Sequence, residues 1–247
     1  MEVRTTGALI AIEGCDGSGK TEAVKAIKEY CEKENIDFIT TREPGGCNIS
    51  EQIRNIIVDK NNKNMTAQTE ALLFAAARTQ HINDTILPAV KEGKIVITDR
   101  FISSSYAYQA YGRGLGMDYI YNINPKAAIP DLVIYLDVDP EVGLSRIKNN
   151  NRDTNRLDEE KLEFYTKCRM GFKEVADQFN TVIIDANKDI DTVKRNVTHA
   201  VKHFLKHDDW FDEICREIKN TYQNIAVTEK PYYEIEVDLK PWKKSIK

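Results

Sequence analysis

Eight residues near the N-terminus combine glycines, a lysine and a threonine in a spacing suited to phosphate. Gly14-Cys15-Asp16-Gly17-Ser18-Gly19-Lys20-Thr21 matches the pattern G-x-x-x-x-G-K-[ST] between an apolar run and a helical pattern. The glycines let the backbone turn tightly and aim N–H groups at phosphate oxygens. Lys20 can reach the β- and γ-phosphates of a nucleotide, and the Thr21 hydroxyl can bind Mg²⁺. The segment therefore predicts a nucleoside triphosphate site.

Charged residues also follow two other apolar runs. Asp99 ends the run at 94–98, where its carboxylate can hold Mg²⁺, and Arg100 beside it can bind a phosphate. Arg42 and Glu43 precede Pro44-Gly45-Gly46, which marks a fixed loop. Ligands of open α/β sheets bind at the carboxyl ends of the strands. We therefore expect both pairs beside the phosphate loop.

A third cluster lies on a predicted helix. In Leu72-Leu73-Phe74-Ala75-Ala76-Ala77-Arg78, Phe74 and Arg78 are four residues apart and share one face. A planar base can stack on Phe74 while Arg78 reaches its phosphate.

The elements that must position these residues alternate along the chain as βαβ units. Predicted strands cover Ala8–Glu13, Phe38–Thr41, Lys94–Thr98, Leu132–Val138 and Val182–Asp185. Predicted helices cover 20–34, 50–59, 66–92, 102–123, 140–147, 158–178 and 190–205, with Pro88 bending or shortening the third. The pattern predicts an α/β fold with a parallel five-stranded sheet flanked by helices.

Composition excludes several classes of protein. The 247 residues carry 35 basic and 39 acidic side chains, a net charge of −4, which argues against a non-specific nucleic-acid or membrane coat. No apolar run is long enough to span a membrane. The 5 cysteines form no paired motif, so we expect reduced thiols and a cytosolic location. We expect one domain over residues 1–207 and an appendage over 208–247, in which the alternation between Pro231 and Pro241 predicts a strand.

Taken in order, these motifs resemble thymidylate kinases of the bacterial type. The similarity covers about residues 7–205 and rests on the phosphate loop and on the segments REPGG at 42–46, LLFAAAR at 72–78, ITDRF at 97–101, YQAYGRG at 108–114 and PDLVIYLDVDPEVGL at 130–144. The resemblance implies a P-loop, nucleoside-monophosphate-kinase fold. It also implies transfer of the γ-phosphoryl group of ATP to dTMP with Mg²⁺, in a homodimer.

The resemblance further implies a role for each matching residue. It implies that Gly14, Cys15, Asp16, Gly17, Ser18, Gly19, Lys20 and Thr21 bind ATP, and that Thr21 and Asp99 bind the metal. It implies that the acceptor nucleotide is bound by Asp16 near the sugar hydroxyl, by Arg42, Glu43 and Arg54, by Phe74 stacked on thymine, by Arg78 and Arg100 on the phosphate, and by Ser105 and Gln109 at the pyrimidine edge. Lys20, Asp99 and Arg100 are the expected catalytic residues near the transferred group.

Residues 146–156 predict a mobile lid, because this segment is rich in asparagine and lies between two helical patterns. Four of its side chains are basic: Arg146, Lys148, Arg152 and Arg156. The family supplies a catalytic arginine either from the phosphate loop or from the lid. Here the corresponding loop position is Gly17, so the resemblance implies that Arg152 and Arg156 supply the charge.

Two other functions stay open at this stage. One is a kinase with a broader choice of deoxynucleoside monophosphates on the same fold. The other is a nucleotide-binding scaffold that has lost catalysis and acts through its C-terminal appendage.

Overall fold

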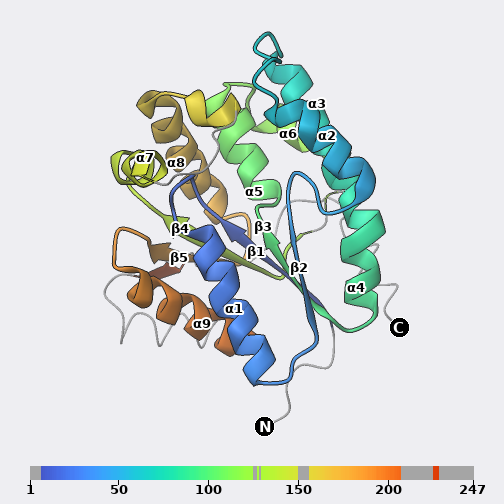
Figure 1. Cartoon of the computed structure of the whole chain (residues 1–247), viewed down its shortest axis with the longest axis vertical. Helices are drawn as coiled ribbons and strands as arrows, with labels where there is room; N and C mark the ends of the chain where they lie inside the picture. Colours follow the sequence, from blue (N-terminus) through green and yellow to red (C-terminus); the bar gives the residue numbers. More distant parts are fainter. Residues whose placement is uncertain (1–6, 125–126, 128, 150–155, 207–224, 228–247) are drawn as a thin grey trace.

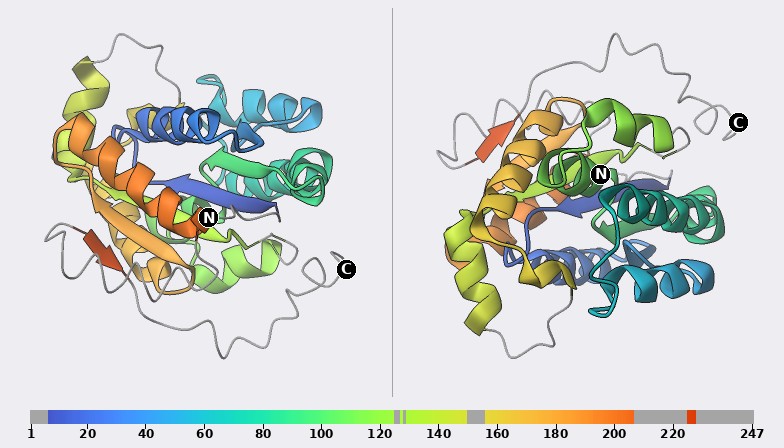
Figure 2. Two further views of the ribbon diagram at one scale, coloured as in Figure 1. Left: turned by 90° about the horizontal axis from the view of Figure 1, so that it is seen from below. Right: turned by 90° about the horizontal axis from the view of Figure 1, so that it is seen from above.

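A parallel β-sheet forms the centre of the molecule, and helices cover both of its faces (Figures 1 and 2). The computed structural model describes residues 7–124, 127, 129–149, 156–206 and 225–227. The strands are β1 (Ala8–Glu13), β2 (Phe38–Arg42), β3 (Ile95–Asp99), β4 (Leu132–Asp137), β5 (Thr181–Asp185) and β6 (Ile225–Val227). Their order is β2-β3-β1-β4-β5-β6, and the first five run parallel. The predicted five-stranded parallel sheet is confirmed.

The sixth strand was not predicted. β6 pairs antiparallel with β5, so three residues of the segment expected to be an appendage extend the sheet. The strand predicted between Pro231 and Pro241 lies outside the described residues.

Helices follow each of the first five strands. They are α1 (Lys20–Lys33), α2 (Asn48–Val58), α3 (Ala67–His81), the π-helical turn η1 (Ile82–Ile86), α4 (Leu87–Lys91), α5 (Ile102–Ser105), the π-helical turn η2 (Tyr106–Gly112), α6 (Met117–Ile123), α7 (Pro140–Asn149), the 3₁₀ turn η3 (Arg156–Glu159), α8 (Leu162–Ala176) and α9 (Ile190–Lys206). Among the helices of the described residues, none has both the length and the apolar character needed to cross a membrane.

Successive residues of β1 point to opposite faces of the sheet, and both faces are apolar. Ile10 and Ile12 pack in one cluster with Ile27 of α1 and residues of α9. Leu9 and Ala11 pack in a second cluster with α3, α4, α5 and the turns η1 and η2. A strand covered on both sides reads as a continuous apolar run, as the sequence of β1 does.

Two predicted helices are interrupted, the first of them near Pro88, where a bend or an end was expected. The helix expected over 66–92 contains the turn η1, because Pro88 has no N–H and the preceding Leu87 N–H bonds to Ile82 O instead. The helix expected over 102–123 ends at η2, since Gly114 and Gly116 adopt φ of +74° and +82° before α6 begins. The helix expected from 158 begins at Leu162, after η3.

Candidate active site

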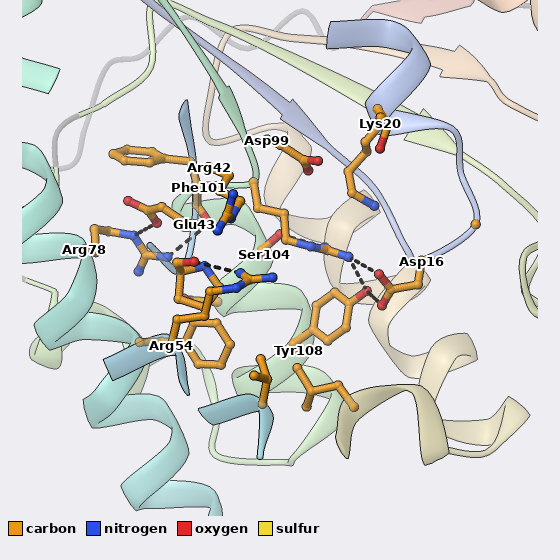
Figure 3. A pocket seen from close by; sticks show the side chains of 18 of the residues that line it. Asp16, Lys20, Arg42, Glu43, Arg54, Arg78, Asp99, Phe101, Ser104 and Tyr108 are labelled. Carbon is orange, nitrogen blue, oxygen red and sulfur yellow. Dashed lines mark hydrogen bonds and ion pairs between the residues drawn. The ribbon is translucent and has the colours of Figure 1, made fainter. Parts of the chain in front are cut away.

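The carboxyl ends of three adjacent strands bring the predicted site residues to one edge of the sheet. Asp99 of β3 pairs in register with Arg42 of β2 and with Ile12 of β1, two residues before the phosphate loop. A cavity of about 600 Å³ opens at this edge. Figure 3 shows Lys20 and Asp16 at one end of it and Arg78 with Glu43 at the other, and Arg100 also lines the cavity.

Most of the predicted site residues line this cavity. They are Asp16, Gly17, Gly19, Lys20, Thr21, Arg42, Glu43, Arg54, Phe74, Arg78, Asp99, Arg100, Ser105 and Gln109. Gly14, Cys15 and Ser18 complete the loop behind it without lining it. Cys15 and Ser18 are 2% exposed.

The phosphate loop wraps the start of α1. Lys20 is 8% exposed, and its Nζ donates to Gly14 O (3.2 Å) and Cys15 O (3.0 Å), which keeps the ammonium group over the loop. Burial lowers the pKa of Lys20, as does the positive charge of Arg100. Gly17 adopts φ +78°, and a Cβ there would meet Gly143 O at 2.2 Å, so the loop packs directly on α7.

Asp16 and Arg100 are paired across the centre of the cavity. Arg100 Nη2 lies 2.6 Å from Asp16 Oδ1, and the Tyr108 hydroxyl donates to Asp16 Oδ2 at 3.0 Å. Burial disfavours the charged carboxylate, but Arg100 and Lys20 outweigh it and lower the pKa of Asp16 to about 2. Asp16 therefore remains a carboxylate at neutral pH.

Glu13 holds the segment that follows Arg100 in place through hydrogen bonds. The sequence did not reveal this role. Glu13 Oε1 accepts hydrogen bonds from the N–H groups of Phe101 (2.9 Å) and Ser104 (3.1 Å), and Oε2 lies 2.5 Å from Ser104 Oγ. Arg100 itself adopts φ +69°, which is uncommon for a side chain of this size. The feature of the sequence that could have indicated this role of Glu13 is an acidic residue at the end of an apolar strand.

The far end of the cavity contains a second buried ion pair. Arg78 is 2% exposed, and its Nε lies 2.7 Å from Glu43 Oε2. Its Nη1 donates to Asn124 Oδ1 and its Nη2 to Phe101 O. Glu43 Oε1 also lies 3.1 Å from His81 Nδ1. Arg78 can thus reach a ligand only through the remaining hydrogens of Nη1 and Nη2.

The loop after β2 adds further positive charge. Arg54 Nη1 donates to Pro44 O at 2.7 Å, which ties α2 to this loop (Figure 3). Arg42 is exposed and bonds through Nη2 to both carboxylate oxygens of Glu51.

Side chains suited to an aromatic base line the same cavity as Arg78. Phe74 of α3 is half-buried, while Ser105 and Gln109 are 3% and 1% exposed. Ser105 Oγ has no hydrogen-bond partner among the described residues. Gln109 Nε2 donates to Glu70 Oε1 at 3.0 Å.

The predicted metal ligands, Asp99 and Thr21, lie at the end of the cavity that contains the phosphate loop. Asp99 Oδ1 is buried and has no hydrogen-bond partner in the described part of the chain, and Thr21 lines the same cavity. A carboxylate and a hydroxyl suit Mg²⁺, which takes its other ligands from water and phosphate. Accordingly, the described residues contain no cluster of three or more His, Cys, Asp or Glu side chains that could form a protein-only metal site.

The basic residues of the predicted lid differ in where the structure places them. Arg152 lies outside the described residues. Arg156 does not line the cavity: its Nη2 lies 2.6 Å from Glu70 Oε2 and its Nε donates to Ile57 O. Arg146 does line the cavity and donates from Nη1 to Gly17 O and Ala186 O. Lys148 is exposed.

A phosphate loop facing an arginine-rich, aromatic pocket, on a parallel sheet of this order, defines a P-loop phosphotransferase with a nucleoside-monophosphate-kinase fold. Residues 12–197 match the family model described as thymidylate kinase. A thymidylate kinase of Clostridium novyi (strain NT) is 52% identical over 206 residues, which cover 81% of this chain and 98% of the relative. A thymidylate kinase of Bacillus velezensis is 46% identical over 207 residues, with the same coverage. The chain belongs to the thymidylate kinase family.

Proposed function

We propose that this protein transfers the γ-phosphoryl group of ATP to dTMP, giving dTDP and ADP. One observation carries the proposal: a single cavity is lined both by Lys20 and Thr21 of the phosphate loop and by Phe74 and Gln109. Two nucleotides bound in this one cavity can meet near Arg100, which also lines it. Positioning of this kind accounts for a large part of phosphoryl-transfer catalysis.

The donor end binds and polarises ATP. Backbone N–H groups of residues 14–19 and the Lys20 ammonium bind the phosphates. Thr21 and Asp99 would hold Mg²⁺, and the lack of a hydrogen-bond partner for the buried Asp99 Oδ1 among the described residues supports this assignment. When bound, Mg²⁺ neutralises charge on the β- and γ-phosphate oxygens.

The acceptor end binds and orients dTMP. Phe74 stacks on the thymine base, and Arg42, Arg54, Arg78 and Arg100 supply positive charge for its phosphate. Asp16, held as a carboxylate by Arg100, accepts a hydrogen bond from the sugar 3′-hydroxyl. Gln109 and Ser105 contact the pyrimidine edge.

Assays with full-length protein, ATP and Mg²⁺ test the proposal with dTMP, dUMP, dCMP and AMP as acceptors. We expect the highest kcat/KM with dTMP. Equal rates with AMP would indicate a general monophosphate kinase. Binding of ATP without turnover of any acceptor would indicate a scaffold.

We also propose a homodimer that forms through α2 and α3. Ile49 and Ile56 of α2 and Leu72 of α3 are 48–50% exposed on these adjacent helices. Sedimentation of the wild-type protein and of Ile56→Asp tests this: we expect a dimer and a monomer, respectively, and two identical profiles would refute the interface.

The four cysteines in the described residues are free, which supports a reducing, cytosolic location.

A further inference from the structure

Glu70 of α3 is a buried carboxylate that does not line the cavity but contacts a residue that does. It is 1% exposed and lies one helical turn before Phe74. Its Oε1 accepts from Gln109 Nε2 (3.0 Å) and Arg113 Nε (3.1 Å). Its Oε2 accepts from Arg113 Nη2 (3.1 Å) and Arg156 Nη2 (2.6 Å).

The chemistry of this contact fixes the orientation of the Gln109 amide. An ionised carboxylate can only accept hydrogen bonds, so the amide nitrogen of Gln109 must face it and not the amide oxygen. Because nitrogen and oxygen leave the amide carbon in different directions, Oε1 remains free to accept from a group in the cavity. A glutamine without such a neighbour can present either atom.

The arginines keep Glu70 in the ionised form that this orientation requires. Burial by itself would raise the pKa of Glu70. Hydrogen bonds and positive charge from Arg113, together with hydrogen bonds from Gln109 and Arg156, more than offset burial and leave the pKa below its usual value. A protonated Glu70 could donate to Gln109 Oε1, and the amide orientation would no longer be fixed.

We propose that Glu70 is a positioning residue that determines acceptor specificity, because it holds Gln109 with its amide oxygen toward the base. That oxygen can accept from the protonated N3 of thymine or uracil, whereas N3 of cytosine carries no hydrogen and is itself an acceptor. The inference rests on the proposed function. It assigns discrimination among pyrimidines to a residue that does not line the cavity.

The test compares Glu70→Gln, Gln109→Ala and the double variant, with kcat/KM measured for dTMP and for dCMP. A glutamine at 70 can either accept from or donate to Gln109. We therefore expect the dTMP/dCMP ratio of Glu70→Gln to fall about tenfold, the value of one hydrogen bond, through a higher KM for dTMP. The KM for ATP should not change. In the Gln109→Ala background, the same substitution should leave the ratio unchanged.

Glu163→Gln is the matched control, because Glu163 is exposed and paired only with Lys167 among its described contacts. An unchanged ratio in Glu70→Gln, or an equal fall with and without Gln109, would overturn the inference. If Glu70→Gln does not fold, a crystal structure of the wild-type protein with dTMP decides. We expect one terminal atom of the Gln109 amide to bond Glu70 and the other to bond N3 of thymine, and a Gln109 amide that contacts the base without contacting Glu70 would refute the inference. Lack of dTMP turnover by the wild-type protein would refute the proposed function instead.

Discussion

Arg100 and Asp16 are 84 residues apart in sequence, yet Arg100 Nη2 lies 2.6 Å from Asp16 Oδ1. The contact joins the segment after β3 to the phosphate loop after β1. It exists because β1 and β3 are parallel neighbours whose carboxyl ends lie at the same edge. The guanidinium group also donates to Gly14 O at 3.0 Å and to Ser104 Oγ at 3.1 Å. Arg100 is therefore fixed between the two nucleotide ends of the cavity by the fold itself.

The titration of the Glu13 carboxyl should make the free energy of unfolding depend on pH. Burial raises the pKa of Glu13 from 4.5 to about 7, an effect that the bonds from Ser104 and Phe101 only partly offset. Between these values the folded protein binds a proton that the unfolded chain releases, so stability falls as pH rises through this window. The fall amounts to about 2–3 kcal/mol. Urea unfolding at pH 5, 6 and 7 should show this loss in the wild-type protein and not in Glu13→Gln. Parallel pH profiles for the two proteins would contradict the assignment.

Phe74→Ala should weaken acceptor binding selectively. Loss of base stacking is worth about 1–3 kcal/mol, so the KM for dTMP should rise about 5- to 150-fold while the KM for ATP stays constant. Steady-state kinetics measures both values. Gln68→Ala on the same helix is a control for helix stability, since Gln68 is exposed. Equal increases in both KM values would argue against a stacking role.

The two lid arginines should differ in their kinetic effects. Arg152→Ala is expected to lower kcat by about 10²-fold with little change in either KM, the effect of removing one donor to the transition state. Arg156 is paired with Glu70, so Arg156→Ala should act mainly on the KM for dTMP. Lys148→Ala, in the exposed part of α7, serves as control. An unchanged kcat in Arg152→Ala would show that Arg152 has no catalytic role.

Gly143 of α7 should be essential for the shape of the phosphate loop. A Cβ at Gly143 would meet Asp16 O at 2.7 Å, so Gly143→Ala must displace the loop or the helix. We expect a loss of about 1–3 kcal/mol in stability and a higher KM for ATP. Thermal unfolding and kinetics check this against Ser145→Ala, an exposed position of the same helix. A variant with wild-type values would mean that the contact is easily relaxed.

Asp99→Asn should raise the Mg²⁺ requirement. Because Asp99 Oδ1 is buried without a partner among the described residues, loss of its charge removes a proposed metal ligand at little structural cost. The free Mg²⁺ concentration for half-maximal activity should increase on the order of tenfold or more. Titration of Mg²⁺ at fixed ATP measures it, with Asp118→Asn, which is exposed, as control. An unchanged titration curve would exclude a metal-binding role.

The sequence by itself determined the sheet and the phosphate loop, because both depend on local patterns. Apolar runs with two buried faces gave the strands, and the spacing of Gly14, Gly19 and Lys20 gave the loop that opens α1. The helix break at Gly114–Gly116 was missed, because apolar periodicity continues through this segment, whereas Pro88 predicted an irregularity near η1.

Only the tertiary structure decided which charges meet. The ion pairs Arg100–Asp16, Arg78–Glu43 and Arg156–Glu70 join residues that are 84, 35 and 86 positions apart. Each depends on which strands are neighbours and on how α3 packs, information that local propensity does not contain. For the same reason no local pattern indicated that Arg156 would pair with Glu70, which also bonds Gln109, and would not line the cavity.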